Sequence, residues 1–202
     1  MFSRRVHAAC GTKRIRANGS LLFPRIMGEP SPHCPALLLL AAFSRHTAAL
    51  DWARQRATDA WGEIVAESPP FDFAETHYYD ATMGPGLRKV FWVFARPFDP
   101  AELVEIKLET NRWEQEYATA AGHAEPRPLN LDPGYLTLAK LVLASTKDFA
   151  HRIYLSQGIY AEVTLQYRHQ QWEHHQYTFP DYRRADYQQF FSRCRELLKA
   201  RH

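Results

Sequence analysis

The chain has 202 residues, of which 46% are hydrophobic and 23% are charged, with a formal net charge of +3 at pH 7. This composition is ordinary for one globular domain, and the sequence lacks the run of about 18 to 20 apolar residues that a membrane-spanning helix requires. Residues 1–26 contain six basic residues and no acid, so the rest of the chain has a net charge of −3, which argues against a general nucleic-acid-binding domain.

The first 34 residues are predicted to form a disordered basic leader followed by a Pro-rich connector. Met27 opens the natural start Met27-Gly28-Glu29-Pro30, so residues 1–26 are interpreted as a mis-assigned start or a disordered tail. An Arg-rich segment without acids also imitates an organelle transit peptide, which is the alternative. Residues 35–202 are predicted to form a single globular domain.

Three cysteines, Cys10, Cys34 and Cys194, stand far apart in the sequence. No two of them have the spacing of a metal or redox motif, so a reducing, cytoplasmic location is expected. Cys194 falls on an apolar helical stripe, which indicates a packing role.

A strand and a helix are predicted to open the domain. Ala36–Phe43 is a continuous apolar run, as expected of a central strand that is covered on both faces. Residues 46–61 carry apolar residues at helical spacing and end at Gly62, a common helix stop. Glu63–Glu67 is predicted to be a short strand.

Alternating apolar and polar residues predict a strand over Phe71–Tyr79. Glu75 and His77 interrupt its aromatic face. Either the end of the strand emerges into solvent there, or the two residues form a functional pair beneath a loop. The next segment, Thr82–Gly86, is predicted to be a flexible loop, because it lacks the length and the Lys-Ser/Thr ending of a phosphate-binding P-loop.

The strongest local pattern in the chain is a helix start that follows a predicted two-sided apolar strand, Lys89–Ala95. Asp99 is expected to cap the helix, with Pro100 in its first turn and Glu102 reaching back to the cap.

This helix carries a polar row beside its apolar stripe. Lys107, Asn111 and Glu114 follow one another at offsets of four and three. They form either a solvated network or part of a site. Thr110 lies inside the apolar stripe, where a hydroxyl group needs a partner, and this raises the second interpretation.

The centre of the chain is predicted to contain a short buried helix. Asp132-Pro133 has the composition of a helix start, with a turn as the alternative. Leu138, Leu141 and Val142 then recur at helical spacing, so residues 135–146 are interpreted as helical. A strand is the competing interpretation, because the run is short.

Residues 151–156 and 159–167 alternate with period two and predict a β-hairpin. A three-residue loop, Ser156-Gln157-Gly158, pairs Ile153 with Ala161 and so groups apolar side chains, whereas a two-residue turn mixes apolar with polar ones. The three-residue loop is therefore preferred.

This register places polar side chains opposite one another on the hairpin face that is predicted to lie away from the core. Arg152 faces Glu162, and the pair is either an exposed cross-strand ion pair worth less than about 1 kcal/mol or part of a pocket wall. The pocket wall would consist of Arg152, Tyr154, Tyr160, Glu162 and Thr164.

Residues 168–177 are predicted to form a polar strand or loop with three histidines, His169, His174 and His175. Adjacent strand residues point to opposite faces, so a shared metal site is not expected here.

A final amphipathic helix, capped by Asp181 or Asp186, must cover a large apolar surface. The order of elements fits an α+β fold, a single domain in which three to four helices pack on a mixed, mainly antiparallel sheet.

Several motifs permit a comparison with known families. They are NLDPGYL (130–136), LASTKDFAHRIYL (143–155), GIYAEVTL (158–165), YYDATMG (78–84), KLETNRWE (107–114) and TFPDYR (178–183). From about Pro35 to the C-terminus the chain resembles a bacterial family known as domain of unknown function 4416. The resemblance implies no activity, because none is established for the family.

The first functional hypothesis is a small-molecule-binding domain or enzyme whose ligand is an anion, phosphorylated or nucleotide-like. Asp132, Glu162 and His151 are the candidate catalytic residues, with the two acids as base or metal ligand. The candidate ligand-binding residues are Lys107, Asn111, Arg127, Asn130, Lys147, Arg152, Tyr160 and Thr164. No resident metal site is predicted, and the sequence names no cofactor, reaction or oligomeric state.

The alternative is a non-enzymatic protein-interaction domain. Its docking surface would use exposed aromatic residues such as Tyr78, Tyr79, Trp172 and Tyr177.

Overall fold

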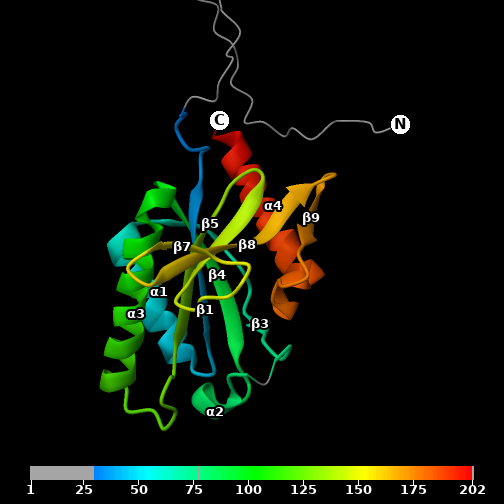
Figure 1. Cartoon of the computed structure of the whole chain (residues 1–202). Helices are drawn as coiled ribbons and strands as arrows, with labels where there is room; N and C mark the ends of the chain where they lie inside the picture. The colour runs from blue at the N-terminus through cyan, green and yellow to red at the C-terminus, as the bar shows by residue number, and fades with distance from the viewer. Residues whose placement is uncertain (1–29, 77, 202) are drawn as a thin grey trace, which may run out of the picture. The chain divides into compact units, whose positions relative to one another are not determined.

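The computed structural model describes residues 30–76 and 78–201 (Figure 1). Pro35–His202 form one compact unit. Residues 30–34, which precede it, have no helix or strand. The predictions made for residues 1–26 and for His77 lie outside the described residues.

The described residues form one nine-stranded sheet in the order β2-β4-β1-β5-β6-β8-β7, with β3 beside β4 and β9 beside β8. All the pairings in it are antiparallel. The strands are β1 (Leu37–Ser44), β2 (Ile64–Glu67), β3 (Phe71–Asp72), β4 (Arg88–Pro97), β5 (Asn130–Leu136), β6 (Lys140–Ser145), β7 (Ile153–Ser156), β8 (Ile159–Arg168) and β9 (Gln171–His174).

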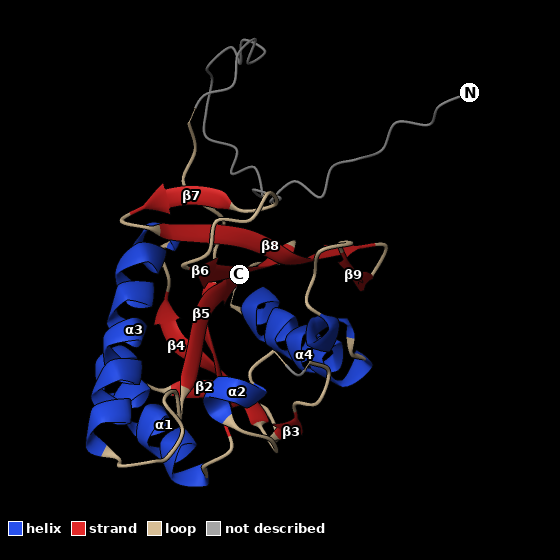
Figure 2. Cartoon of the chain, turned by 60° about the horizontal axis from the view of Figure 1, so that its bottom comes forward, coloured by secondary structure: helices blue, strands red, loops and turns tan. Residues whose placement is uncertain are grey.

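Helices cover both faces of this sheet, which confirms the predicted α+β fold. Figure 2 shows α1 and α3 on one side of β4 and β5, and α4 on the other. None of the helices in the described part of the chain is long and apolar enough to cross a membrane. The helices are α1 (Thr47–Trp61), α2 (Asp80–Met83), α3 (Leu103–Ala120) and α4 (Ala185–Ala200), with short 3-10 helices η1 (Pro100–Glu102) and η2 (Pro180–Arg183).

Strand β1 lies in the middle of the fold because its alternate residues are apolar on both faces. Leu38 and Leu40 pack on the side of α1 and α3, whereas Leu37 and Leu39 pack on the side of α4. All four are at most 1% exposed. The prediction of a central two-sided strand is confirmed.

The prediction of a helix over residues 135–146 is wrong, and the competing strand interpretation holds for β6. The segment consists of the end of β5, a turn and β6. In the turn, the Thr137 hydroxyl accepts hydrogen bonds from the backbone N–H groups of Ala139 and Lys140. Leu141 and Val142 are buried on opposite faces of the sheet. A strand covered on both faces is apolar at successive positions, and in a short run this cannot be told from a helix.

The prediction that Asp132 and Pro133 start a helix, and its alternative of a turn, are both wrong. Both lie within β5, where Asp132 is paired with Ala41 and Pro133 with Leu40 of β1.

The hairpin formed by β7 and β8 has the predicted pairing of Ile153 with Ala161, but the turn differs. Gln157 and Gly158 alone form it, both with positive φ (53° and 76°), as a type I′ turn requires. A register shift between Tyr154 and Ser156 absorbs the extra residue.

The predicted faces of this hairpin are also wrong. Ile153 is 69% exposed, because β7 is the last strand of the sheet, whereas Glu162 and Thr164 are buried.

Two further predictions are wrong at the ends of elements. Of the strand predicted over Phe71–Tyr79, only Phe71–Asp72 pairs with β4. Neither Asp181 nor Asp186 caps α4, whose N-cap is Arg184 without a side-chain hydrogen bond. The carboxylate of Asp181 instead pairs with Lys89.

Candidate functional site

A cavity of about 600 Å³ lies at one end of the sheet, where β5 and β6 part. The pairing of β5 with β1 continues to Asn130, whereas its pairing with β6 stops at Gly134 and Leu143. Beyond this point β6 stays paired with β8 as far as Ser145. Figure 2 shows β8 running across rather than alongside β5. The cavity therefore lies between two parts of one sheet.

Charged and aromatic side chains make up much of the cavity wall. The charged lining residues are Glu75, Lys89, Lys107, Arg127, Asp132, Lys147, Arg152, Glu162 and Asp181. The aromatic ones are Phe43, Phe73, Tyr78, Tyr79, Phe149, Phe179 and Tyr182.

The structure brings most of the candidate residues together in this cavity. Three of them, His151, Tyr160 and Thr164, do not line it. Those that line it are Lys107, Asn111, Arg127, Asn130, Asp132, Lys147, Arg152 and Glu162.

Lys107 and Asp132 form the centre of the wall between α3 and β5. The Lys107 side chain is 5% exposed, and its Nζ donates to the Leu131 carbonyl oxygen at 2.7 Å and to Asp132 Oδ1 at 3.3 Å. Asn130 donates to the other Asp132 oxygen at 2.7 Å. The predicted polar row on α3 is therefore not a solvated face at Lys107.

Burial favours the neutral form of Asp132, but the positive charges of Lys107, Lys89 and Arg127 outweigh it. Together with the hydrogen bond from Asn130, they hold the pKa of Asp132 below its ordinary value. Asp132 is therefore a carboxylate at neutral pH, and its side chain is 29% exposed.

Glu114 supports the wall from behind. Its carboxylate accepts from the Leu131 backbone N–H at 2.6 Å and from Arg127 Nη2 at 3.0 Å. Burial raises the pKa of Glu114 above its ordinary value, although the charges of Lys107 and Arg127 oppose this effect. Arg127 is thus fixed at the rim of the cavity by an acid that is itself 12% exposed.

Arg152 and Glu162 form a buried ion pair, not the exposed pair of the simpler sequence interpretation. The Arg152 Nε atom lies 2.7 Å from Glu162 Oε2, and the two side chains are 3% and 2% exposed. Arg152 also donates to the Ser145 hydroxyl at 2.6 Å and to the Lys147 carbonyl oxygen at 3.1 Å. This arginine holds β8, the end of β6 and the following loop together.

The remaining candidates lie around this ion pair. Thr164 is fully buried and donates to Glu162 Oε1 at 3.2 Å. His151 Nε2 lies 3.3 Å from Glu162 Oε2, and its ring stacks on Tyr177. Tyr160 instead contacts Tyr154 on the hairpin, with the ring centres 5.3 Å apart.

Sequence reasoning missed the pair of Lys89 and Asp181, whose Nζ and Oδ2 atoms are 2.6 Å apart and whose side chains are 3% and 4% exposed. The available signal was a lysine directly before the apolar run 90–94 of β4, because a buried charge without a partner is not tolerated. The Lys89 ammonium group lies within 6.0 Å of the ring centres of Phe43, Phe73, Phe91, Tyr182 and Tyr187.

Tyr78 and Lys147 lie at the exposed part of the cavity wall. Tyr78 is 67% exposed, and its hydroxyl accepts a hydrogen bond from Lys147 Nζ at 2.8 Å. This hydrogen bond and the lysine charge lower the pKa of Tyr78.

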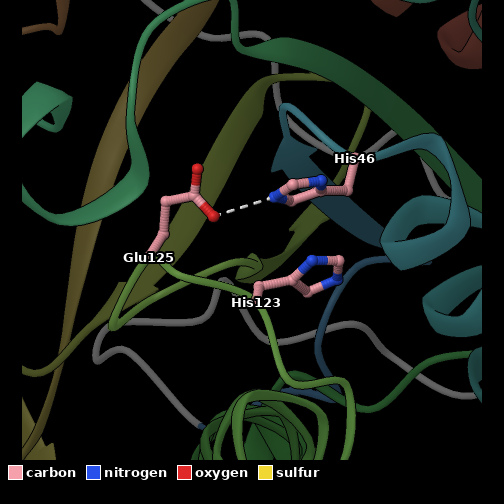
Figure 3. A group of neighbouring side chains, drawn as sticks. All are labelled: His46, His123 and Glu125. Atoms are coloured by element: carbon pink, nitrogen blue, oxygen red, sulfur yellow. Dashed lines mark hydrogen bonds and ion pairs between the residues drawn. The ribbon is translucent and has the colours of Figure 1, made fainter.

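A second group of side chains lies outside the cavity lining and has the composition of a metal site. His46, His123 and Glu125 each offer a ligand atom, and these atoms lie within 4.8 Å of one another. Figure 3 shows the three side chains beside one another, with the Glu125 carboxylate hydrogen-bonded to the His46 ring. The sequence predicted no resident metal site and, among the histidines, a shared metal was considered only for His169, His174 and His175. His46 is distant in sequence from His123 and Glu125, so no local spacing indicates this cluster.

Comparisons with known proteins bear on the family alone. No curated protein and no solved structure matches the chain. The family model described as "Domain of unknown function (DUF4416)" matches residues 34–198, which is most of the chain. The motifs that line the cavity fall within this match, and the protein belongs to the DUF4416 family.

Proposed function

We propose that the cavity between β5 and β6 binds a small anionic molecule, phosphorylated or nucleotide-like. The observation that carries this proposal is the position of Lys89 and Lys107, whose side chains are 3% and 5% exposed and line the same cavity. Burying an ammonium group is costly, so two buried lysines in one cavity call for a role that offsets this cost.

Both lysines retain hydrogen-bonding capacity for a ligand. An ammonium group has three N–H donors. Among the described residues, Lys107 Nζ donates to Leu131 and Asp132, and Lys89 Nζ donates to Asp181. The unused donors suit the oxygens of a phosphate or carboxylate group, and Arg127 adds a planar donor at the rim.

The two acids of the site are proposed to have different roles: Asp132 binds an uncharged group of the ligand, and Glu162 positions Arg152. Asp132 is the partly exposed carboxylate, at 29%, so it can accept a hydrogen bond from a ligand hydroxyl or amine. In an enzyme it would be the base. Glu162 is 2% exposed and fully engaged, so we assign it, with His151 and Thr164, to positioning Arg152.

The test is a thermal-shift and calorimetric screen of the full chain with inorganic phosphate, sugar phosphates and nucleotides. A ligand stabilises the folded protein by mass action. Asn111→Asp adds a negative charge to the cavity wall and should weaken binding of any anion about 10-fold or more. Gln115→Glu makes the same change in charge on an exposed position of α3 and should leave binding intact.

Two results would contradict the proposal. One is the absence of a thermal shift with all of these anions. The other is a shift that Asn111→Asp and Gln115→Glu reduce equally, because binding would then depend on the overall charge and not on the cavity.

A second candidate function, docking of a protein partner, rests on strand β7. This last strand of the sheet exposes Ile153 by 69%, Tyr154 by 58% and Leu155 by 39%, and edge strands of this kind pair with other chains. Of the aromatic residues predicted to dock a partner, Tyr78 is exposed and Trp172 is buried. We propose a second copy of the chain as the partner. Sedimentation should detect a dimer that Ile153→Lys dissociates, and a monomer at all concentrations would exclude it.

A bacterial, cytoplasmic protein is proposed on the family resemblance and the cysteine spacing. Labelling of thiols in intact cells tests the location, because cysteines exposed to the cytoplasm stay reduced.

A further inference from the structure

The cluster of His46, His123 and Glu125 joins two segments that are distant in sequence. His46 is the N-cap residue of α1, and the other two residues lie in the connection between α3 and β5. All three are half-buried, and Figure 3 shows the Glu125 carboxylate directed at His46, with the His123 ring beside that of His46. None of them lines the cavity, so the cluster is a separate site.

The spacing within the cluster suits coordination of one ion. His46 Nε2 and Glu125 Oε2 are 3.1 Å apart. Two ligands at about 2.0–2.2 Å from one metal ion, at angles between a right angle and the tetrahedral angle, are separated by roughly 3–3.5 Å. An ion can therefore replace the hydrogen bond between these two atoms without movement of the backbone.

The second imidazole needs a small rotation to complete the set. The rings of His46 and His123 stack with centres 3.8 Å apart and planes 18° apart. Ring lone pairs lie in the ring plane, so one ring must tilt before both converge on an ion. The His46 side chain is 26% exposed, so its ring can tilt toward solvent. The Glu125 side chain is 15% exposed and can follow it.

Outer contacts leave one free ligand atom on each of two residues. The Tyr117 hydroxyl lies 3.1 Å from His123 Nε2, so it can accept from Nε2–H, which leaves the lone pair on Nδ1. Arg45 Nη1 donates to Glu125 Oε1 at 2.8 Å, which leaves Oε2. Hydrogen bonds of this kind fix the tautomer and orientation of metal ligands in proteins.

We propose that His46, His123 and Glu125 bind a divalent transition-metal ion, with Zn²⁺ as the best fit. Two imidazole nitrogens and one carboxylate oxygen suit zinc, whereas magnesium and calcium prefer oxygen ligands alone. Three protein ligands leave a fourth position for water. The bound ion would clip the start of α1 to the connection after α3.

The experiment titrates the metal-stripped full chain with Zn²⁺ by calorimetry and with Co²⁺ by absorption spectroscopy. One ion should bind per chain, and the Co²⁺ spectrum should be that of nitrogen and oxygen ligands without a thiolate charge-transfer band. His123→Gln and Glu125→Gln should each weaken binding by more than about 100-fold, the upper range for loss of a mere outer contact. Tyr117→Phe removes only such a contact and should weaken binding about 10-fold.

The matched control is His169→Gln. His169 Nδ1 also lies 3.0 Å from a carboxylate, that of Glu173, but His169 belongs to no three-residue cluster among the described residues. This variant should bind Zn²⁺ like the wild type. Thermal unfolding of each metal-free variant reports whether it is folded. If His123→Gln does not fold, the Zn²⁺ affinity of Glu125→Gln tests the proposal in its place.

The proposal is overturned if the folded variants bind the ion as tightly as the wild type, if the Co²⁺ spectrum contains a thiolate band, or if the wild type binds no ion.

Discussion

The ammonium group of Lys89 on β4 lies 2.6 Å from the carboxylate of Asp181 in η2, 92 residues further along the chain. Both side chains are almost completely buried, at 3% and 4% exposure. The pair ties the segment before α4 to the sheet at the wall of the cavity. Removing both charges from water costs about as much free energy as their attraction returns, so the pair contributes little to stability. We therefore associate it with ligand binding.

Removing one partner of this pair should be more damaging than removing both. Lys89→Met leaves Asp181 buried without a counter-ion and should lower the free energy of unfolding by about 3–5 kcal/mol. The double variant Lys89→Met/Asp181→Leu should recover much of this loss. Urea denaturation measures both effects. If the double variant were no more stable than Lys89→Met, the charge pair itself would be a stabilising element, which would argue against its retention for ligand binding.

The two acids around Lys107 should respond to pH in opposite ways. The pKa of Asp132 is lowered in the folded protein, so its charge contributes stability above the ordinary aspartate pKa of about 3.9, and this contribution is lost as the pH falls through the folded value. The difference in unfolding free energy between the wild type and Asp132→Asn should therefore be constant near neutral pH and should shrink in acid.

Glu114 provides the counterpart. Its pKa is raised by burial, so the neutral form is more favoured in the folded state than in the unfolded state. The wild type should lose stability relative to Glu114→Gln as the pH rises above about 4.3, the ordinary glutamate value. Denaturant titrations at several pH values measure both differences, and slopes of the same sign for Asp132→Asn and Glu114→Gln would contradict the assignment.

A capping prediction from the sequence permits a direct check of local stability. Asp99 accepts a hydrogen bond from the Ala101 backbone N–H at 2.9 Å, and Glu102 completes the capping box. Asp99→Ala should lower the free energy of unfolding by about 1 kcal/mol. Asp51→Ala, at an exposed position of α1, serves as the control and should change it by less than about 0.5 kcal/mol.

The elements that depend on local pattern were predictable. The capping box at Asp99, the two-sided strand β1 and the apolar face of α4 each follow from spacing within a dozen residues. The misassigned segment 135–146 has no such unambiguous pattern. It forms strands because β1 pairs with β5 and β8 pairs with β6. These partners lie in distant parts of the chain, so the local sequence does not show them.

The candidate site was predictable in part for a related reason. Lys107, Asp132 and Arg152 were predicted because they stand in the motifs that carry the family resemblance. Lys89 and Asp181 were missed, because each has an ordinary local explanation, as the end of a strand and as a helix cap. Only the crossing of the last segment over the sheet brings them together.

Gly134 marks the point at which β5 and β6 part, and it offers the sharpest test of how the cavity is built. A Cβ atom added there would lie 2.7 Å from Leu143 Cδ2 and closer still to the Val142 carbonyl oxygen. Gly134→Ala should therefore force the two strands apart and lower the free energy of unfolding by about 1–3 kcal/mol. Adding Leu143→Ala removes only the side-chain clash. Because the nearest atom belongs to the backbone of β6, the double variant should not be more stable than Gly134→Ala in urea denaturation. Wild-type stability of Gly134→Ala would mean that β5 and β6 separate without cost.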